Sequence, residues 1–309
     1  MNSPVVYVIL GPTATGKTDL LLQLAKTTNI EVINCDSRQI YQDMPIGTTQ
    51  PSVEIRKAVT HHLIDFLSPD QQFSAGQFKQ HANKLILEII SRGNLPVVCG
   101  GTGFYYRSLS TEMIELPDND SLKQEISQMT HIERVELLKK KDPLSVVQPG
   151  ESSKAGRIHP NDQYRIERAL LVLMQTGRPL RSYYEAGFNV RKDLKFIGFW
   201  LDIEIEEWRS LVVKRARQMI DSGMVDEAVR IRQQFGICPG LNTVGYFEAL
   251  QCADLEISQQ KFEEKLIQSH LQYGRHQRLW FRKQSHLPLY SKEEALDNFQ
   301  KDLNSVIQS

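Results

Sequence analysis

Short apolar runs alternate with helix-like segments in the N-terminal third of the chain. Residues 5–10, 31–35 and 96–99 are strand-like runs rich in β-branched side chains, and residues 17–26 have the spacing of a helix. The stretch "LILEIISRGNLPVVCGGTG" repeats the pattern with a helix that stops near Gly93, a strand, and a glycine turn at residues 100–103. This alternation predicts an α/β fold, in which helices cover both faces of a parallel sheet.

The middle of the chain has a different pattern. Residues 116–188 contain helical periodicity and loops broken by proline and glycine, which predicts a mainly helical insertion domain. Its clearest helix has Asn161 or Asp162 as the cap, an apolar stripe from Ile166 to Leu173, and a stop at Gly177. Strand composition returns in "LKFIGFWLDI", and helical patterns follow. We therefore expect a core made of residues 1–115 and 189–309, interrupted by the insertion.

Composition and charge limit the possible classes of protein. With 40% hydrophobic and 24% charged residues, the composition is typical of a globular protein. The early apolar run is too short to span a bilayer and no signal peptide precedes it, so we expect a cytoplasmic protein without a membrane partner. The four cysteines stand singly, which predicts neither disulfides nor a zinc site. Lys plus Arg equals Asp plus Glu at 37 each, so only a local basic patch could bind nucleic acid.

A phosphate-binding loop follows the first predicted strand. The sequence "GPTATGKT", residues 11–18, matches G-x-x-x-x-G-K-[ST] with a strand before it and a helix after it. In such a loop, main-chain N–H groups and a lysine hold phosphate, and the last hydroxyl binds Mg²⁺. A glycine turn that binds nothing is the weaker alternative. The predicted contacts are Gly11, Thr13, Ala14, Thr15, Gly16, Lys17 and Thr18.

The aspartate that an ordinary P-loop ATPase carries after a second buried strand is missing, because "LPVVCGG" ends in cysteine and glycine. Asp36 instead ends the strand in "EVINCDS", next to the loop if the two strands are neighbours. We favour a catalytic base or metal ligand over a cap or turn residue. Thr102 in "GGTGFYY" can approach a ligand, although a plain turn is common, and we interpret His61 and His62 as structural.

Two sets of arginines stand out. Arg215 lies within the apolar stripe of a helix that contains Trp208, Leu211, Val212, Ala216 and Met219, so it needs either a salt bridge or a bound anion such as pyrophosphate. In "SHLQYGRHQRLWFRK", Arg275, Arg278 and Arg282 share one helical face among aromatic side chains, which suits a phosphate backbone. A solvated basic face is the alternative. Arg165 and Arg168 could extend this basic track.

Eight motifs occur together in one order: "GPTATGKT", "DSRQIYQDMPIGT", "HHLIDF" with "FSAGQF", "GGTGFY", "HPNDQYRIERAL", "RQMIDSGMVDE", "VGY" and "RHQRLWFR". In this set the chain resembles the tRNA dimethylallyltransferase (isopentenyl-diphosphate:tRNA transferase) family. The bacterial form is the better match, because no Cys/His cluster follows the basic helix as it does in eukaryotic relatives. The stretch "QPGESSKAGRIHPND" departs from the family pattern.

The resemblance implies transfer of a dimethylallyl group from dimethylallyl diphosphate to N6 of the adenosine immediately 3′ of the anticodon, in tRNAs that read codons beginning with U. Diphosphate leaves, and Mg²⁺ is required. By similarity residues 13–18 hold the diphosphate, Thr18 sits at the metal, Arg215 binds the diphosphate from the opposite side, and Asp36 is the general base. The tRNA contacts implied are Asp36, Ser37, Arg38, Gln39, Thr102, Asp162, Gln163, Arg165, Arg168, Arg275, Arg278 and Arg282. We expect a monomer without an obligate protein partner.

Three other functions stay open from the sequence. An adenylate isopentenyltransferase shares the loop, the aspartate and the reaction, but acts on free AMP, ADP or ATP. In a P-loop nucleotide kinase the loop would bind ATP. A non-catalytic tRNA-binding protein is the third.

Overall fold

The computed structural model of the protein describes residues 3–112, 119–147, 157–185 and 189–307. It divides into two compact units, residues 1–110 with 191–309, and residues 111–190. The domain boundaries expected from the sequence lie at or within stretches outside the described residues, and so does all of "QPGESSKAG", residues 148–156.

The first unit is built on one parallel sheet. Among the described residues six strands follow the order β3-β2-β4-β1-β5-β6. They are β1 (Val5–Leu10), β2 (Ile30–Asn34), β3 (His61–His62), β4 (Leu95–Gly100), β5 (Lys195–Leu201) and β6 (Leu289–Tyr290). The four long strands are those that the apolar pattern predicts, which confirms the α/β class. The two edge strands have two residues each, too few to show a pattern.

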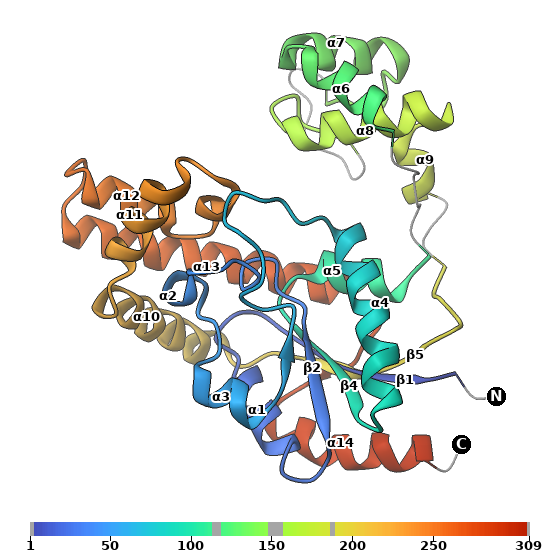
Figure 1. Cartoon of the computed structure of the whole chain (residues 1–309), viewed down its shortest axis with the longest axis vertical. Helices are drawn as coiled ribbons and strands as arrows, with labels where there is room; N and C mark the ends of the chain where they lie inside the picture. The colour runs from blue at the N-terminus through green and yellow to red at the C-terminus, as the bar shows by residue number, and fades with distance from the viewer. Residues whose placement is uncertain (1–2, 113–118, 148–156, 186–188, 308–309) are drawn as a thin grey trace. The chain divides into compact units, whose positions relative to one another are not determined.

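Helices cover both faces of this sheet (Figure 1). One face carries α1 (Lys17–Leu24) and α14 (Lys292–Ile307), and the other carries α4 (Ala75–Ser91) and α5 (Gly103–Ser110). In α4 the spacing of Phe78, Ala82, Ile86 and Ile89 places four buried side chains on one helical stripe against the sheet. The layers hold the carboxyl ends of the strands at one edge, which is where an open α/β sheet places its ligands.

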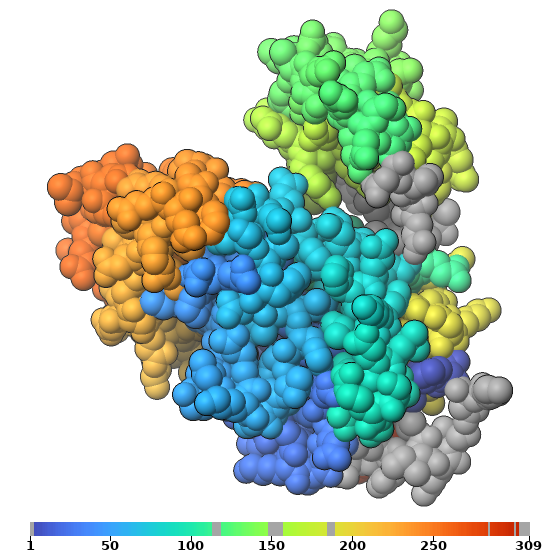
Figure 2. Space-filling model, viewed as in Figure 1, coloured from blue at the N-terminus to red at the C-terminus, as the bar shows by residue number. Residues whose placement is uncertain are grey.

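A group of helices packs beside that edge. It contains α2 (Pro45–Thr48), α3 (Val53–Ala58), α10 (Ile205–Asp221), α11 (Met224–Phe235), the 3₁₀ turn η1 (Pro239–Asn242), α12 (Tyr246–Ala253) and α13 (Gln259–Gln284). Buried residues of α10 to α13, which include Tyr246 and Phe262, form a second core together with Ile40, Tyr41, Met44 and Leu67. Figure 2 shows α11 and α12, in orange, against the blue segment that contains α2.

The second unit is helical where it is described, with α6 (Asp120–Gln128), α7 (His131–Lys141), α8 (Gln163–Thr176) and α9 (Leu180–Glu185). It has its own core, to which Ile166 and Leu170 of α8 contribute. As predicted, α8 begins at Asp162, whose side chain accepts the Arg165 N–H, and ends at Gly177 in the left-handed conformation. No helix in the described part of the chain is long and apolar enough to cross a bilayer.

Candidate active site

The phosphate loop joins β1 to α1 at the carboxyl edge of the sheet. Ala14 and Gly16 adopt left-handed conformations, with φ of 63° and 81°, and Gly16 is the N-cap of α1. Consecutive peptides bent in this way direct their N–H groups into one concavity. Among the described residues, no protein group accepts the N–H groups of Ala14, Thr15 and Gly16. The loop therefore presents unused donors and a helix N-terminus to an anion.

The lysine of the loop is folded back over its own main chain. Lys17 Nζ donates to the carbonyl oxygens of Gly11 at 2.9 Å and Pro12 at 2.7 Å. Burial lowers the pKa of Lys17 to about 8, and the nearby Arg215 cation adds to the effect. A bound anion would stabilise the charged form and so offset the effects of burial and of Arg215 on this pKa.

Arg215 enters the same pocket from α10. Its neighbours Val212, Ala216 and Met219 are buried as the stripe predicts, and Arg215 lies among the residues that line the pocket with Thr13 to Thr18. Burial lowers the pKa of Arg215 to about 10, opposed in part by the charge of Asp36. Among the described residues no carboxylate forms an ion pair with Arg215. Of the two alternatives that the sequence left open, the salt bridge does not form among the described residues, and the anion site stays a prediction.

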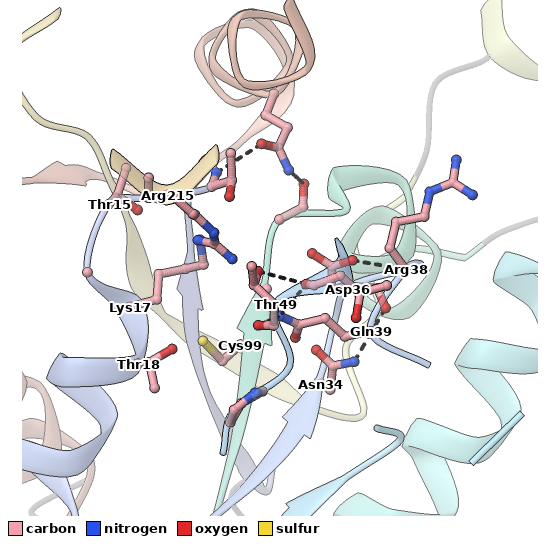
Figure 3. Close-up of a pocket in the computed structure, with 18 of the residues that line it drawn as sticks. Thr15, Lys17, Thr18, Asn34, Asp36, Arg38, Gln39, Thr49, Cys99 and Arg215 are labelled. Carbon is pink, nitrogen blue, oxygen red and sulfur yellow. Dashed lines mark hydrogen bonds between the residues drawn. The ribbon is translucent and has the colours of Figure 1, made fainter. Parts of the chain in front are cut away.

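Asp36 faces this cationic side from across the pocket. Figure 3 shows Lys17 and Arg215 with their nitrogen ends turned toward the space that Asp36 borders from the other side. Asp36 Oδ1 accepts the Arg38 N–H at 2.8 Å, so the residue does form the turn that we kept as an alternative. No described protein group donates to Asp36 Oδ2, which leaves one carboxylate oxygen for a ligand.

The separation of Asp36 from the loop differs from the expectation that their strands are neighbours. Strand β4 lies between β1 and β2. Two inter-strand spacings amount to about 10 Å, so the aspartate and the phosphate loop stand on opposite sides of a gap rather than side by side. A substrate that spans this gap would have its anionic end at the loop and its reacting end at Asp36.

Part of the pocket wall comes from residues that the sequence did not single out. The Gln39 side chain donates to the carbonyl oxygens of Thr48 and Thr49, which line the pocket with it. Helix α2 is held in turn by the buried carboxylate of Glu227, which accepts the N–H groups of Ile46 and Gly47 and the hydroxyl of Tyr246. The motifs "MPIGT", "RQMIDSGMVDE" and "VGY" are the signals that could have found this wall, since these residues belong to them.

The two adjacent histidines have different environments. His62 binds Glu31, which Arg92 and Asn94 also contact, and these partners lower the pKa of Glu31 to about 2. The structural interpretation is therefore confirmed for His62. His61 instead lines the pocket, and no described group makes a hydrogen bond to its buried Nε2.

Three predicted site residues do not line the pocket. Gly11, Ser37 and Thr102 are not among the residues that line it. The Thr102 hydroxyl accepts the Ser37 N–H at 2.9 Å, and the Gly11 N–H donates to the Gly100 carbonyl. Their hydrogen bonds hold the backbone next to the lining residues, whereas Arg38 and Gln39 themselves line the pocket.

The three arginines of α13 do not share one environment. Arg275 is exposed, and Arg282 lies 3.6 Å from Asp202 with its side chain 61% exposed. Arg278 is only 6% exposed: its Nε donates to Asp202 Oδ1 at 2.6 Å and its guanidinium stacks on Trp208. The side chain of Arg278 is thus engaged inside the protein, and we no longer place it on an RNA-binding face.

The remaining predicted residues belong to the second unit. Asp162 caps α8 and pairs with Arg165 at 3.3 Å, and this arginine is exposed. Gln163 is exposed and Arg168 is half-buried on the same helix.

Fold and site together define a class: a P-loop α/β protein whose anion cradle faces an arginine without a carboxylate partner among the described residues, with an aspartate on the far side of the pocket. A family model described as IPP transferase matches residues 39–284. The chain is 36% identical over 308 residues to a tRNA dimethylallyltransferase of Anoxybacillus flavithermus, covering 98% of this chain and 94% of that protein. It is 31% identical to one of Koribacter versatilis, covering 92% of each.

Solved structures give the same result. The tRNA delta(2)-isopentenylpyrophosphate transferase of Staphylococcus epidermidis is 31% identical, with a TM-score of 0.69, and the match covers 98% of this chain and 99% of that one. A eukaryotic dimethylallyltransferase crystallised acting on tRNA shares the fold at 24% identity, with a TM-score of 0.76 over 94% of this chain and 74% of its own. This chain belongs to the IPP transferase family.

Proposed function

We propose that this protein transfers the dimethylallyl group of dimethylallyl diphosphate to N6 of the adenosine 3′-adjacent to the anticodon, in tRNAs that read codons beginning with U. The observation that carries the proposal is the two-sided pocket of Figure 3. Two cations and unused main-chain donors lie on one side, and the free carboxylate oxygen of Asp36 lies on the other.

The cationic side suits a leaving group. Breaking the allylic C–O bond moves an electron pair onto the diphosphate, so negative charge grows there in the transition state. The N–H groups of residues 14–16, Lys17 and Arg215 are fixed before the reaction and stabilise that charge. Water is not a reactant, which explains why the site needs no residue to position one.

The opposite side suits the acceptor. As N6 forms its bond to the allylic carbon, it must lose a proton, and Asp36 Oδ2 is the oxygen available to take it. An adenosine in a structured loop reaches such a pocket only when it is extruded from its stack. Arg38 and Gln39 line the pocket beside Asp36 and would contact the extruded base.

The donor set fits Mg²⁺ that arrives with the diphosphate. The described residues contain no cluster of three or more His, Cys, Asp or Glu that could cage a metal, whereas Thr18 lines the pocket directly after Lys17. Mg²⁺ usually retains waters and binds through substrate phosphates and one or two protein oxygens. Once bound at Thr18, it would supply further charge neutralisation at the diphosphate.

The RNA would extend beyond the pocket to polar and cationic side chains that are exposed or half-buried. Arg275 and Arg282 on α13, and Gln163, Arg165 and Arg168 on α8, are available to an anticodon arm. We propose that the protein acts on tRNA as a monomer in the cytoplasm. The names of the relatives weigh against an adenylate acceptor and against a kinase, and the experiment below includes both.

Replacing Asp36 with asparagine tests the proposal. The amide oxygen of the new side chain would still accept the Arg38 N–H, so the turn stays intact, but the base is lost and transfer should fall by about 10²- to 10⁴-fold. Transfer is followed by nucleoside mass spectrometry of tRNA incubated with dimethylallyl diphosphate and Mg²⁺, and tRNA affinity by filter binding should not change. Prenylation of AMP with no mass shift on tRNA, or ATP turnover without prenyl transfer, would refute the proposal.

A further inference from the structure

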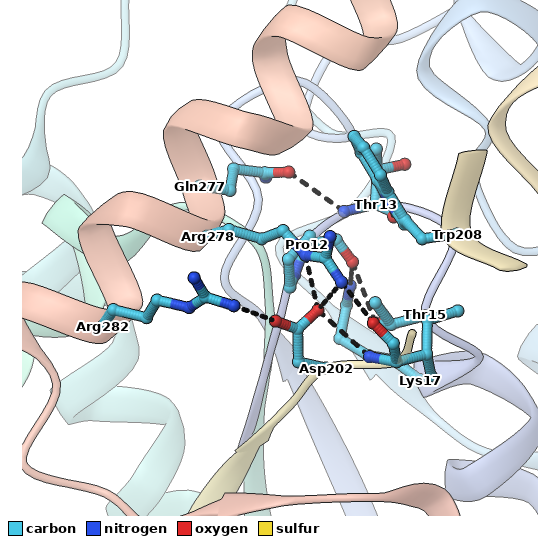
Figure 4. Close-up of polar contacts among 10 residues, drawn as sticks. Pro12, Thr13, Thr15, Lys17, Asp202, Trp208, Gln277, Arg278 and Arg282 are labelled. Carbon is cyan, nitrogen blue, oxygen red and sulfur yellow. Dashed lines mark hydrogen bonds and ion pairs between the residues drawn. The ribbon is translucent and has the colours of Figure 1, made fainter. Parts of the chain in front are cut away.

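One side chain of α13 joins the two glycine-rich loops of the active site. Gln277 Oε1 accepts the main-chain N–H of Thr13 in the phosphate loop at 3.0 Å. On the same amide, Nε2 donates to the carbonyl oxygen of Gly101, in the turn after β4, at 2.9 Å. Figure 4 shows Gln277 reaching from α13 to Thr13. Two loops that are distant in the sequence are thus connected through a third segment far along the chain.

The chemistry of this position specifies glutamine. The partners in the two loops are main-chain groups, so one must donate and the other must accept, and the Tyr273 hydroxyl also contacts this amide. A carboxamide is the neutral side chain that ends in one acceptor and one donor, and Gln277 is 7% exposed, so an unmatched partner would be left buried. A Cβ placed on Gly101 would lie 2.3 Å from Gln277 Nε2, which explains the absence of a side chain there.

The phosphate-loop end of this connection is fixed from a second direction. The Trp208 indole N–H donates to the Thr13 carbonyl oxygen at 3.1 Å. The Trp208 ring is itself covered by the Arg278 guanidinium, which Asp202 holds. Both main-chain polar groups of Thr13 therefore have side-chain partners from outside the loop. The main chain of Thr13, which the sequence predicted to contact the diphosphate, is engaged by the protein instead.

The other end of the connection leads to the strand of Asp36. Next to Gly101, the Thr102 N–H donates to the Cys35 carbonyl at 3.0 Å, and the Thr102 hydroxyl accepts the Ser37 N–H at 2.9 Å. These contacts hold the residues on both sides of Asp36. A continuous set of hydrogen bonds therefore runs from the phosphate loop, through Gln277, to the backbone that carries the carboxylate.

We propose that Gln277 is a positioning residue, which sets the separation between the diphosphate loop and the backbone of Asp36. The proposal rests on the proposed function, because that separation is the distance between leaving group and base. Group transfer depends steeply on such distances, and a displacement of about 1 Å can cost about 100-fold in rate. The N–H groups of Ala14 to Gly16, Lys17 and Arg215 do not contact Gln277, so diphosphate affinity should be spared.

This role also accounts for the motif "RHQRLWFR". From the sequence alone we interpreted it as a tRNA-binding face. In the structure Gln277 and Arg278, at its centre, point to the phosphate loop and its supports, and only the flanking Arg275 and Arg282 are exposed among its described arginines.

The test is Gln277→Met, which keeps the length and volume but removes both hydrogen bonds. Single-turnover transfer with tRNA and dimethylallyl diphosphate both saturating should slow by about tenfold or more. Pyrophosphate affinity by calorimetry and tRNA affinity should stay within about twofold of wild type, since a positioning role predicts loss in rate and not in binding. Gln268→Met, on the exposed side of the same helix, is the matched control and should behave as wild type.

A second variant guards against misfolding. Gln277→Glu is nearly isosteric and keeps an acceptor for Thr13, but it sets a carboxylate against the Gly101 carbonyl, and we expect it to fold and to slow transfer as well. Wild-type rates in both variants would overturn the inference, as would losses that match the fraction of molecules that fail to bind pyrophosphate. If wild-type protein binds pyrophosphate but prenylates nothing, the proposed function fails instead.

Discussion

At the scale of single residues, the protonation of Lys17 should determine how diphosphate affinity depends on pH. Burial lowers the pKa of this ammonium from 10.5 to about 8. Between these two values the unfolded chain holds a proton that the folded protein lacks, so this residue makes the folded state more stable as pH rises across the window. A bound diphosphate favours the charged form and has the opposite effect, since the complex regains the proton.

Pyrophosphate affinity should therefore fall as pH rises above about 8, and binding at pH 9 should take up nearly one proton. Calorimetry in buffers of different ionisation enthalpy measures the net proton exchange, to which pyrophosphate contributes because it also titrates near that pH. Lys17→Met, which keeps the pyrophosphate contribution and lacks the ammonium, should bind more weakly at pH 7 and take up about one proton fewer than wild type at pH 9. Equal proton uptake by the variant would assign the titration to another group.

At the scale of elements, α13 combines two functions that helical spacing alone cannot separate. The spacing places Arg275, Arg278 and Arg282 on neighbouring positions of one face, as the sequence predicts. It does not reveal that the centre of this face meets Asp202, which lies 76 residues away and follows β5. Helical spacing is also an incomplete guide to burial in α10. Leu211 falls within the predicted apolar stripe, but it is 37% exposed.

Arg278→Met should accordingly change the stability of the protein, and Arg275→Met its binding of tRNA. The first leaves Asp202 buried without its main partner, and the free energy of unfolding should drop by about 3–5 kcal/mol. The second should leave stability within about 0.5 kcal/mol, weaken tRNA binding, and reduce the salt dependence of binding by about one ion. Urea unfolding and filter binding at several salt concentrations make the comparison. A stable Arg278→Met variant with weakened tRNA binding would restore our original interpretation of this arginine.

At the scale of the whole molecule, the sequence predicts the individual elements better than the order of the strands in the sheet. Phosphate loop, central strands and insertion follow from local patterns, because each apolar run reflects burial of its own residues. The placement of β4 between β1 and β2 depends on long-range packing, and so does the gap that separates Asp36 from the loop. Gln277 was missed for the same reason, since its contacts come from distant segments, and the place of His61 in the pocket wall likewise depends on the fold.

The insertion offers a test at this scale. The Arg191 N–H donates to the Ser110 carbonyl at 3.2 Å, so the two ends of the first unit already meet where the second unit departs. The second unit has a separate core, and none of its described residues lines the active-site pocket.

Replacing residues 111–190 with a short glycine linker should therefore leave a folded protein that binds pyrophosphate with wild-type affinity. If the exposed residues of α8 contact RNA, as we propose, tRNA affinity should fall by about tenfold or more, since several phosphate contacts are lost together. A full-length variant with Arg165 and Arg168 changed to Gln tests whether the charges of the second unit matter apart from its fold. This variant should fold as wild type does, but its affinity for tRNA should stay below that of wild type. If the protein without residues 111–190 binds tRNA as tightly as wild type, the first unit alone binds the RNA, and Arg275 and Arg282 account for its phosphate contacts.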